Sequence, residues 1–262
     1  MSEPASSDLP LFYSAVEPLD KERHASLGLA SNRSNFSFAS KASAVPLNTP
    51  EFNFALKNFP IVFTSTTDPQ PIAVLGLQRE QNLFVNPDGT WQLGAYVPIY
   101  VRRYPFIFGA LETDDQYALC VDSAADMVSN SPDQPFFKDG ELTETAQKGV
   151  ETCQVFQQQH AATKKVMEKL AASGLLEQRE ATVNLKGTTK VLSSYIGVSE
   201  ERLGTLSDEQ FLELRHNDLL PFVYMHLASL SNWMRLLDLH IARNPLPEAA
   251  ASNGGTVFPA GP

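Results

Sequence analysis

Cysteine is scarce in this 262-residue chain, which contains only Cys120 and Cys153. Two cysteines exclude a disulfide framework and a cysteine-rich zinc site. Basic residues are also outnumbered, because 20 lysines and arginines face 30 aspartates and glutamates, for a formal net charge of -10. A chain this acidic is repelled by phosphate backbones and by anionic lipids. We therefore expect no nucleic-acid partner and no binding to anionic membrane surfaces.

The sequence also lacks a long apolar run. The longest uncharged, apolar-rich stretch, 219–234, is shorter than the roughly 20 residues that span a bilayer, and it contains His226 and Asn232. This stretch is typical of a buried helix, so we predict no membrane insertion. The N-terminus has neither the basic nor the apolar region of a secretory signal. Together these absences predict a cytoplasmic protein with reduced thiols.

Common enzyme signatures are absent as well. We find no phosphate-binding loop of the Gly-x-x-x-x-Gly-Lys-Ser/Thr type and no Gly-x-Gly-x-x-Gly dinucleotide motif. The Gly-x-Ser-x-Gly turn of hydrolases and the His-Glu-x-x-His zinc helix are also missing. We therefore predict no cofactor. The pattern favours a protein without catalysis, while an enzyme of another type stays open.

The residues that are present predict an α+β fold. Residues 11–125 show short apolar runs between Pro, Gly, Asn and Asp, which is typical of strands. Residues 143–243 are mostly helical by pattern, and we expect the two regions to pack together in one compact unit. Residues 1–10 and the Pro/Ala/Gly-rich residues 244–262 are predicted to be disordered tails. The expected strands are 61–64, 72–77, 83–85, 91–93 and 117–121.

Helix signals are clear in the second region. Thr143 can cap a helix that continues to residue 173, where Gly174 would end it. Ser207 and Gln210 have the spacing of a capping box. Pro221 should interrupt the next helix, and 222–242 is predicted as one continuous helix. Between these helices, 181–185 and 190–192 are predicted to form a hairpin.

Several segments resemble the bacterial SapC family over residues 11–243. The most specific is Tyr96-Val97-Pro98-Ile99-Tyr100-Val101-Arg102-Arg103-Tyr104-Pro105-Phe106. The other matching segments are Pro60-Ile61-Val62-Phe63, Ala73-Val74-Leu75-Gly76-Leu77, Asp88-Gly89-Thr90-Trp91 and Tyr224-Met225-His226-Leu227-Ala228-Ser229-Leu230.

The resemblance implies a setting more than a reaction. The family takes its name from a surface-layer secretion locus. Its wider members are encoded beside TonB-dependent receptors, flavin-dependent halogenase-like proteins and cupin-like hydroxylases, which implies such neighbours as partners. We therefore hypothesise a non-catalytic accessory protein that binds a protein or peptide client in surface-layer export, TonB-dependent uptake or peptide modification. The alternatives are an oxygenase-like modifying enzyme and a small-molecule carboxylate-binding module, and a homodimer is left open.

The candidate binding residues lie in the segment that carries the resemblance. If this segment is a strand, Tyr100, Arg102 and Tyr104 share one face and Arg103 lies on the other. An arginine between tyrosine rings suits a carboxylate, a phosphate or a protein partner. The alternative is a structural arginine paired with an internal carboxylate such as Glu51 or Asp122. The candidate ligand- or partner-binding residues are Tyr96, Tyr100, Arg102, Arg103, Tyr104 and Trp233.

A metal site is the weaker candidate. His216, Asp218 and a distant His226 have the residue types of a non-haem iron centre. However, residues two apart on a helix do not face each other, and a solvated helix end explains the same residues. His226, Trp233 and His240 would lie on one face of the last helix. That face would hold either satisfied core groups or a partner-facing patch.

Overall fold

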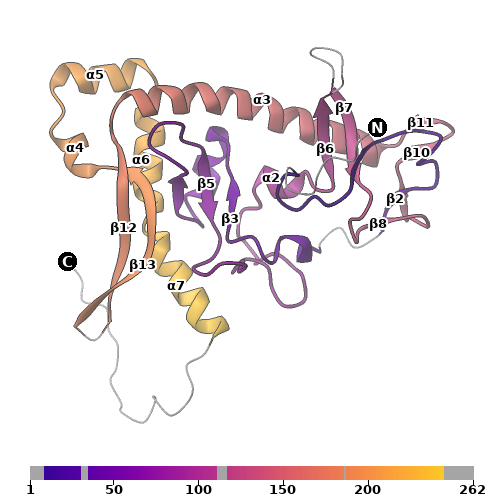
Figure 1. The fold of residues 1–262 in the computed structure, drawn as a ribbon, viewed down its shortest axis with the longest axis horizontal. Coiled ribbons are helices and arrows are strands. Elements are labelled where there is room, and N and C mark those ends of the chain that lie inside the picture. The colour runs from indigo at the N-terminus through magenta and orange to yellow at the C-terminus, as the bar shows by residue number, and fades with distance from the viewer. Residues whose placement is uncertain (1–8, 31–34, 111–116, 186, 245–262) are drawn as a thin grey trace, which may run out of the picture.

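The computed structural model describes residues 9–30, 35–110, 117–185 and 187–244 of the chain. Small sheets and helices pack together as the predicted α+β fold, with the long hairpin and the C-terminal helices at one end (Figure 1). The tails expected at 1–10 and 244–262 fall almost entirely outside the described residues. None of the helices within the described ranges has both the length and the apolar content that crossing a bilayer requires.

The largest sheet has five strands and joins both halves of the chain. All of its neighbours are antiparallel, in the order β12-β13-β4-β5-β3. The expected strands at 61–64 and 72–77 and the hairpin at 181–192 are confirmed, and the hairpin is longer than predicted. The strands are β3 (Ala44–Pro46), β4 (Ile61–Phe63), β5 (Pro71–Val74), β12 (Leu176–Leu185) and β13 (Thr188–Val198).

Smaller sheets form the opposite end of the molecule. One has the order β1-β7-β6 and another the order β8-β2-β9, while β10 pairs with β11. The strand expected at 117–121 is confirmed as β7. The bounds are β1 (Val16–Pro18), β2 (Gly28–Leu29), β6 (Phe106–Ala110), β7 (Tyr117–Asp122), β8 (Val128–Ser129), β9 (Gln134–Pro135), β10 (Phe137–Lys138) and β11 (Glu141–Leu142).

The strands expected at 83–85 and 91–93 are wrong. These segments meet in a single bridge between Val85 and Trp91. The side chain of Asp88 accepts from the N–H of Thr90, 2.9 Å away, inside the turn itself. Backbone bonds from Asn86 to Thr90 and from Gln92 to Phe84 flank the bridge, and the pairing ends there, so the turn forms without a longer ladder.

Helix α3 (Glu144–Ala172) runs along the length of the molecule and connects its two ends (Figure 1). It begins after Thr143 and ends before Gly174, which has a φ of 69°, as predicted. Its first half packs Ala146 and Cys153 into one apolar cluster, and its second half packs Met167 into another. The third and largest cluster lies under the five-stranded sheet.

The C-terminal helices follow the predicted caps but not the predicted continuity. Ser207 and Gln210 form the expected capping box, and a new helix starts beside Pro221. The helix expected at 222–242 is broken after Ser229, because the Ser229 hydroxyl bonds the carbonyl of His226 at 2.6 Å and draws it out of the helical ladder. The bounds are α4 (Glu200–Gly204), α5 (Asp208–His216), α6 (Leu220–Ser229) and α7 (Asn232–Arg243).

Short helical turns complete the first half. Residues 49–55 form a 3-10 turn followed by one α-helical turn. The bounds are η1 (Ser37–Ala39), η2 (Thr49–Glu51), α1 (Phe52–Ala55) and α2 (Ile99–Arg102).

Candidate functional site

The tyrosine- and arginine-rich segment is helical, so the strand predicted for it is wrong. Ile99–Arg102 forms α2, which begins directly after Pro98. Proline is favoured at a helix start, and the carboxylate of Glu51 accepts the N–H of Ile99 at 2.8 Å. In a helix, Tyr100, Arg102 and Tyr104 do not share one face. The segment is divided instead between an exposed patch and a buried cage.

The exposed patch contains Tyr96, Arg102 and Phe54. The rings of Phe54 and Tyr96 stack with centroids 5.5 Å apart, and the Cζ of Arg102 lies 5.8 Å from the Tyr96 centroid. Arg102 Nε also donates to the carbonyl of Val97 at 3.0 Å. Phe54 is half exposed, which is unusual for phenylalanine. A stacked aromatic pair beside an exposed arginine is typical of a protein-contact surface.

Neither of the two carboxylates suggested as arginine partners forms an ion pair with Arg102 or Arg103. Buried Glu51 accepts from the Tyr96 hydroxyl at 3.0 Å and from backbone N–H groups. Burial raises the pKa of its carboxyl although these bonds act in the opposite direction. Asp122, fully buried, accepts from the Tyr104 hydroxyl at 3.2 Å and from the N–H groups of residues 14 and 15. Tyrosine hydroxyls and backbone N–H groups, and not an arginine, are thus the hydrogen-bond donors to these two carboxylates.

The buried cage surrounds Arg103. Its Cζ lies 4.3 Å from the Tyr100 ring centroid and 4.1 Å from that of Phe156 on α3. Tyr100 is itself in the core, and its hydroxyl donates to the carbonyl of Leu11 at 3.3 Å. Tyr104 stacks on Phe38 with centroids 4.2 Å apart. Three of the candidate residues therefore contribute to packing.

His226 lies between two strands. Its Nδ1 donates to the carbonyl of Ile61 on β4 at 2.6 Å, while its Nε2 accepts the N–H of Val198 on β13 at 3.0 Å. The imidazole replaces the direct backbone bond that these two strands would otherwise form. Burial lowers the pKa of His226 to about 4, so the ring is neutral at pH 7. Both ring nitrogens are engaged, which leaves none for a metal ion.

The other metal candidates lie elsewhere. His216 ends α5 and Asp218 follows it with a φ of 57°, and both are exposed. Across the described ranges, no three His, Cys, Asp or Glu side chains are grouped as metal ligands. The shared helix face expected for His226, Trp233 and His240 is wrong, because the break after Ser229 places His226 on α6 and the other two on α7.

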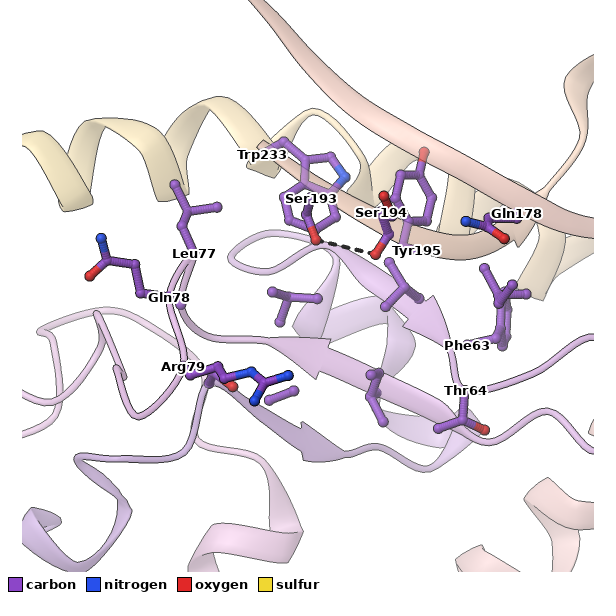
Figure 2. A pocket seen from close by; sticks show the side chains of 17 residues that line it. Phe63, Thr64, Leu77, Gln78, Arg79, Gln178, Ser193, Ser194, Tyr195 and Trp233 are labelled. Carbon is purple, nitrogen blue, oxygen red and sulfur yellow. Dashed lines mark hydrogen bonds between the residues drawn. The ribbon is translucent and has the colours of Figure 1, made fainter. Parts of the chain in front are cut away.

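Trp233 lies in the wall of a cleft of about 520 Å³ between the β12–β13 hairpin and the rest of the sheet (Figure 2). Its indole packs against Tyr195 of β13 with ring centroids 5.5 Å apart. The apolar floor consists of side chains of β3, β4 and β5, among them Ile72 and Val74. Sequence reasoning found Trp233 but not the cleft, because β13 and β4 are more than 120 residues apart.

The cleft opens because β13 diverges from β4. The two strands pair only at Ile196 and Phe63. The N–H of Val198 points toward β4, where His226 receives it, whereas the N–H of Ser199 bonds to Leu175 next to β12. Backbone groups alternate along a strand, so Ser194, like Ile196 and Val198, directs its N–H and C=O away from β12. This edge of β13 borders the cleft.

The polar groups of the cleft are mostly neutral. Its rim and walls carry Thr64, Gln78, Gln178 and the Ser193 hydroxyl, which donates to the carbonyl of Ser194 at 3.3 Å (Figure 2). Arg79, exposed at the mouth, is the one formally charged side chain in the lining described here. That lining contains no Asp, Glu, His or Cys. The arrangement is suited to binding rather than to acid–base chemistry.

Comparison with known proteins identifies the family. The family model described as SapC matches residues 19–236. The chain belongs to the SapC family. No curated protein matches this SapC-family chain, and no solved structure does. The match includes α2, the cleft strands and the start of α7 with Trp233, so the cleft and the exposed patch lie in the family's region of the chain.

Proposed function

We propose that this SapC-family protein is a non-catalytic accessory protein that binds an extended segment of a protein or peptide client in the cleft beside β13. The carrying observation is the cleft itself, where a strand edge lies beside an apolar floor. An extended peptide can add to such an edge through its backbone and place alternate side chains on the floor. The proposal also covers a cytoplasmic location and a role in surface-layer export, TonB-dependent uptake or peptide modification, as family membership suggests.

The dimensions of the cleft support a peptide. Its volume of about 520 Å³ falls within the range of about 300–1,000 Å³ that is typical of ligand sites. The edge at Ser194 is short, because β13 contains a bulge at Leu192, where the pairing with β12 skips one residue. Bulges limit uncontrolled strand pairing at sheet edges. A short strand edge beside an apolar floor favours binding of one matching client segment and disfavours pairing with arbitrary strands.

The exposed patch supports the same function by a second surface. Phe54, Tyr96 and Arg102 line a shallow pocket together with residues of α3, and none of the three belongs to the described lining of the cleft. A client that docks one segment in the cleft has a further aromatic and cationic surface to contact. Halogenase-like or hydroxylase-like neighbours are the candidates for such a client.

The test is a proline at the open edge. Ser194→Pro removes the outward N–H and places the ring where a client strand would pair, without removing a β12–β13 bond. The client is first identified by native mass spectrometry of the tagged protein from its source cells. We expect Ser194→Pro to weaken client binding at least ~10-fold in a calorimetric titration, since the edge bonds are lost.

Ser194→Ala is the matched control. It keeps the backbone N–H and should bind the client like the wild type. Circular dichroism and thermal unfolding establish that both variants are folded. Equal client affinity for a folded Ser194→Pro variant would show that β13 is not the docking edge.

A further inference from the structure

Arg103 is a buried cation that forms no ion pair with any described residue. It is only 7% exposed, and arginine keeps its proton at any physiological pH. Among the described residues, no carboxylate lies within ion-pair distance of it, and its Nε is buried with no hydrogen-bond partner. The flanking rings of Tyr100 and Phe156 offset part of the cost of desolvation through cation–π contact. They do not neutralise the charge.

Arg103 also contributes to the lining of a second cavity. This cavity has a volume of about 240 Å³ and lies between α2 and the first turns of α3. Arg102 and Lys148 contribute to its lining as well, whereas no Asp or Glu is among its described lining residues. In a chain with a net charge of -10, such a concentration of cations is unexpected on composition alone.

The neighbouring cations already have partners, so Arg103 is the one left unmatched. Arg102 donates to the carbonyl of Val97, and Lys148 pairs with Glu144 on the outer surface of α3. Thr145 and Thr152 of α3 also line the cavity, and their hydroxyls donate to Gln134 and to the carbonyl of Lys148.

The opposite wall is aromatic. Phe38 and Tyr104, stacked at 4.2 Å, line the cavity together with Phe36 and Phe106. Flat ring faces next to a cationic end are suited to a ligand with an apolar body and an anionic head.

We propose that this cavity is a binding site for a small oxyanion, a carboxylate or phosphate group carried on an apolar or aromatic body. The anionic head would be held by Arg103, with Lys148 at the mouth, and the body would pack against Phe38 and Tyr104. The site shares Arg102 with the exposed patch but no described lining residue with the client cleft. Binding of a small anion here does not depend on a client in the cleft.

The experiment measures binding of benzoate, phenyl phosphate and inorganic phosphate to the full chain at constant ionic strength. Calorimetry gives the affinity, and thermal unfolding gives the stabilisation that a ligand of the native state produces. We expect benzoate or phenyl phosphate to bind and raise the melting temperature. The tighter of the two identifies the head group as carboxylate or phosphate. Inorganic phosphate should bind more weakly than phenyl phosphate, because it has no body to pack.

Two variants connect binding to this cavity. Arg103→Lys should lower the affinity for the tighter-binding probe by at least ~10-fold, because the forked guanidinium contact is lost. Lys148→Glu changes an exposed side chain, so this variant should stay folded even if Arg103→Lys unfolds. Lys148→Glu should also lower the affinity for the probe. Lys165→Gln, exposed further along α3, is the control and should bind normally. The proposal is overturned if no probe binds the wild type at millimolar concentration, or if Lys148→Glu leaves affinity unchanged.

Discussion

At the residue scale, the helical turn at 99–102 directs Arg102 to the surface and the next residue, Arg103, into the interior. Pro98 favours a helix start at this point, and the distant Glu51 stabilises it by accepting the N–H of Ile99. That contact links residues 48 positions apart, beyond the reach of a local pattern.

His226, a candidate metal ligand in the sequence, has a structural role: its ring bridges β4 and β13. Its pKa of about 4 lies below the ordinary value of 6.5, so the unfolded chain binds a proton that the folded chain rejects between these pH values. Stability contributed by the neutral ring is complete above about pH 6.5 and is lost as the pH falls toward 4.

We therefore expect the free energy of unfolding to fall between pH 7 and pH 5 by about 2 kcal/mol more in the wild type than in His226→Gln. Urea unfolding at the two pH values measures the difference. His216→Gln, at an exposed histidine, should retain the wild-type dependence. An unchanged pH dependence in His226→Gln would mean that another group controls acid sensitivity.

At the scale of elements, caps and stops were the most reliable signals. Helix ends lie at Thr143, Gly174, Ser207 and Pro221 where the sequence places them, because such signals depend on neighbours within one turn. Ser207 makes its capping bond, whereas the Thr143 side chain makes none. The break between α6 and α7 was missed, since the apolar pattern continues through it while the Ser229 side chain competes for a helical carbonyl.

Helix α3 gives a prediction at this scale. A Cβ added at Gly149 would lie 2.7 Å from the Phe106 ring, so the glycine allows α3 to approach β6 closely. We expect Gly149→Ala to destabilise the protein by about 1–3 kcal/mol although alanine favours helices. Gly204→Ala, at the end of α4 with open space around it, should cost little. Denaturant unfolding compares the two, and equal stabilities would show that the α3–β6 contact adjusts freely.

At the scale of the whole molecule, the fold class could be predicted but the client cleft could not. Short apolar runs in the first half and helical periodicity in the second half are enough to predict the α+β class. The cleft arises because β13, from the second half, joins β4, from the first half, at one residue pair and then diverges. Its shape depends on His226 bridging the two strands and on Trp233 of α7 closing one wall. These contacts are long-range, and no local sequence pattern specifies them.

The central claim is that the cleft holds an extended client segment, and site-specific photo-crosslinking tests it most directly. A photoreactive amino acid replaces Gln78, an exposed residue at the cleft mouth, or Leu212 on α5 as the control position. After irradiation in the source cells, mass spectrometry maps the crosslinked peptides. The account predicts one contiguous segment of one client at position 78 and none at position 212. Crosslinks scattered over many proteins, or equal at both positions, would contradict it.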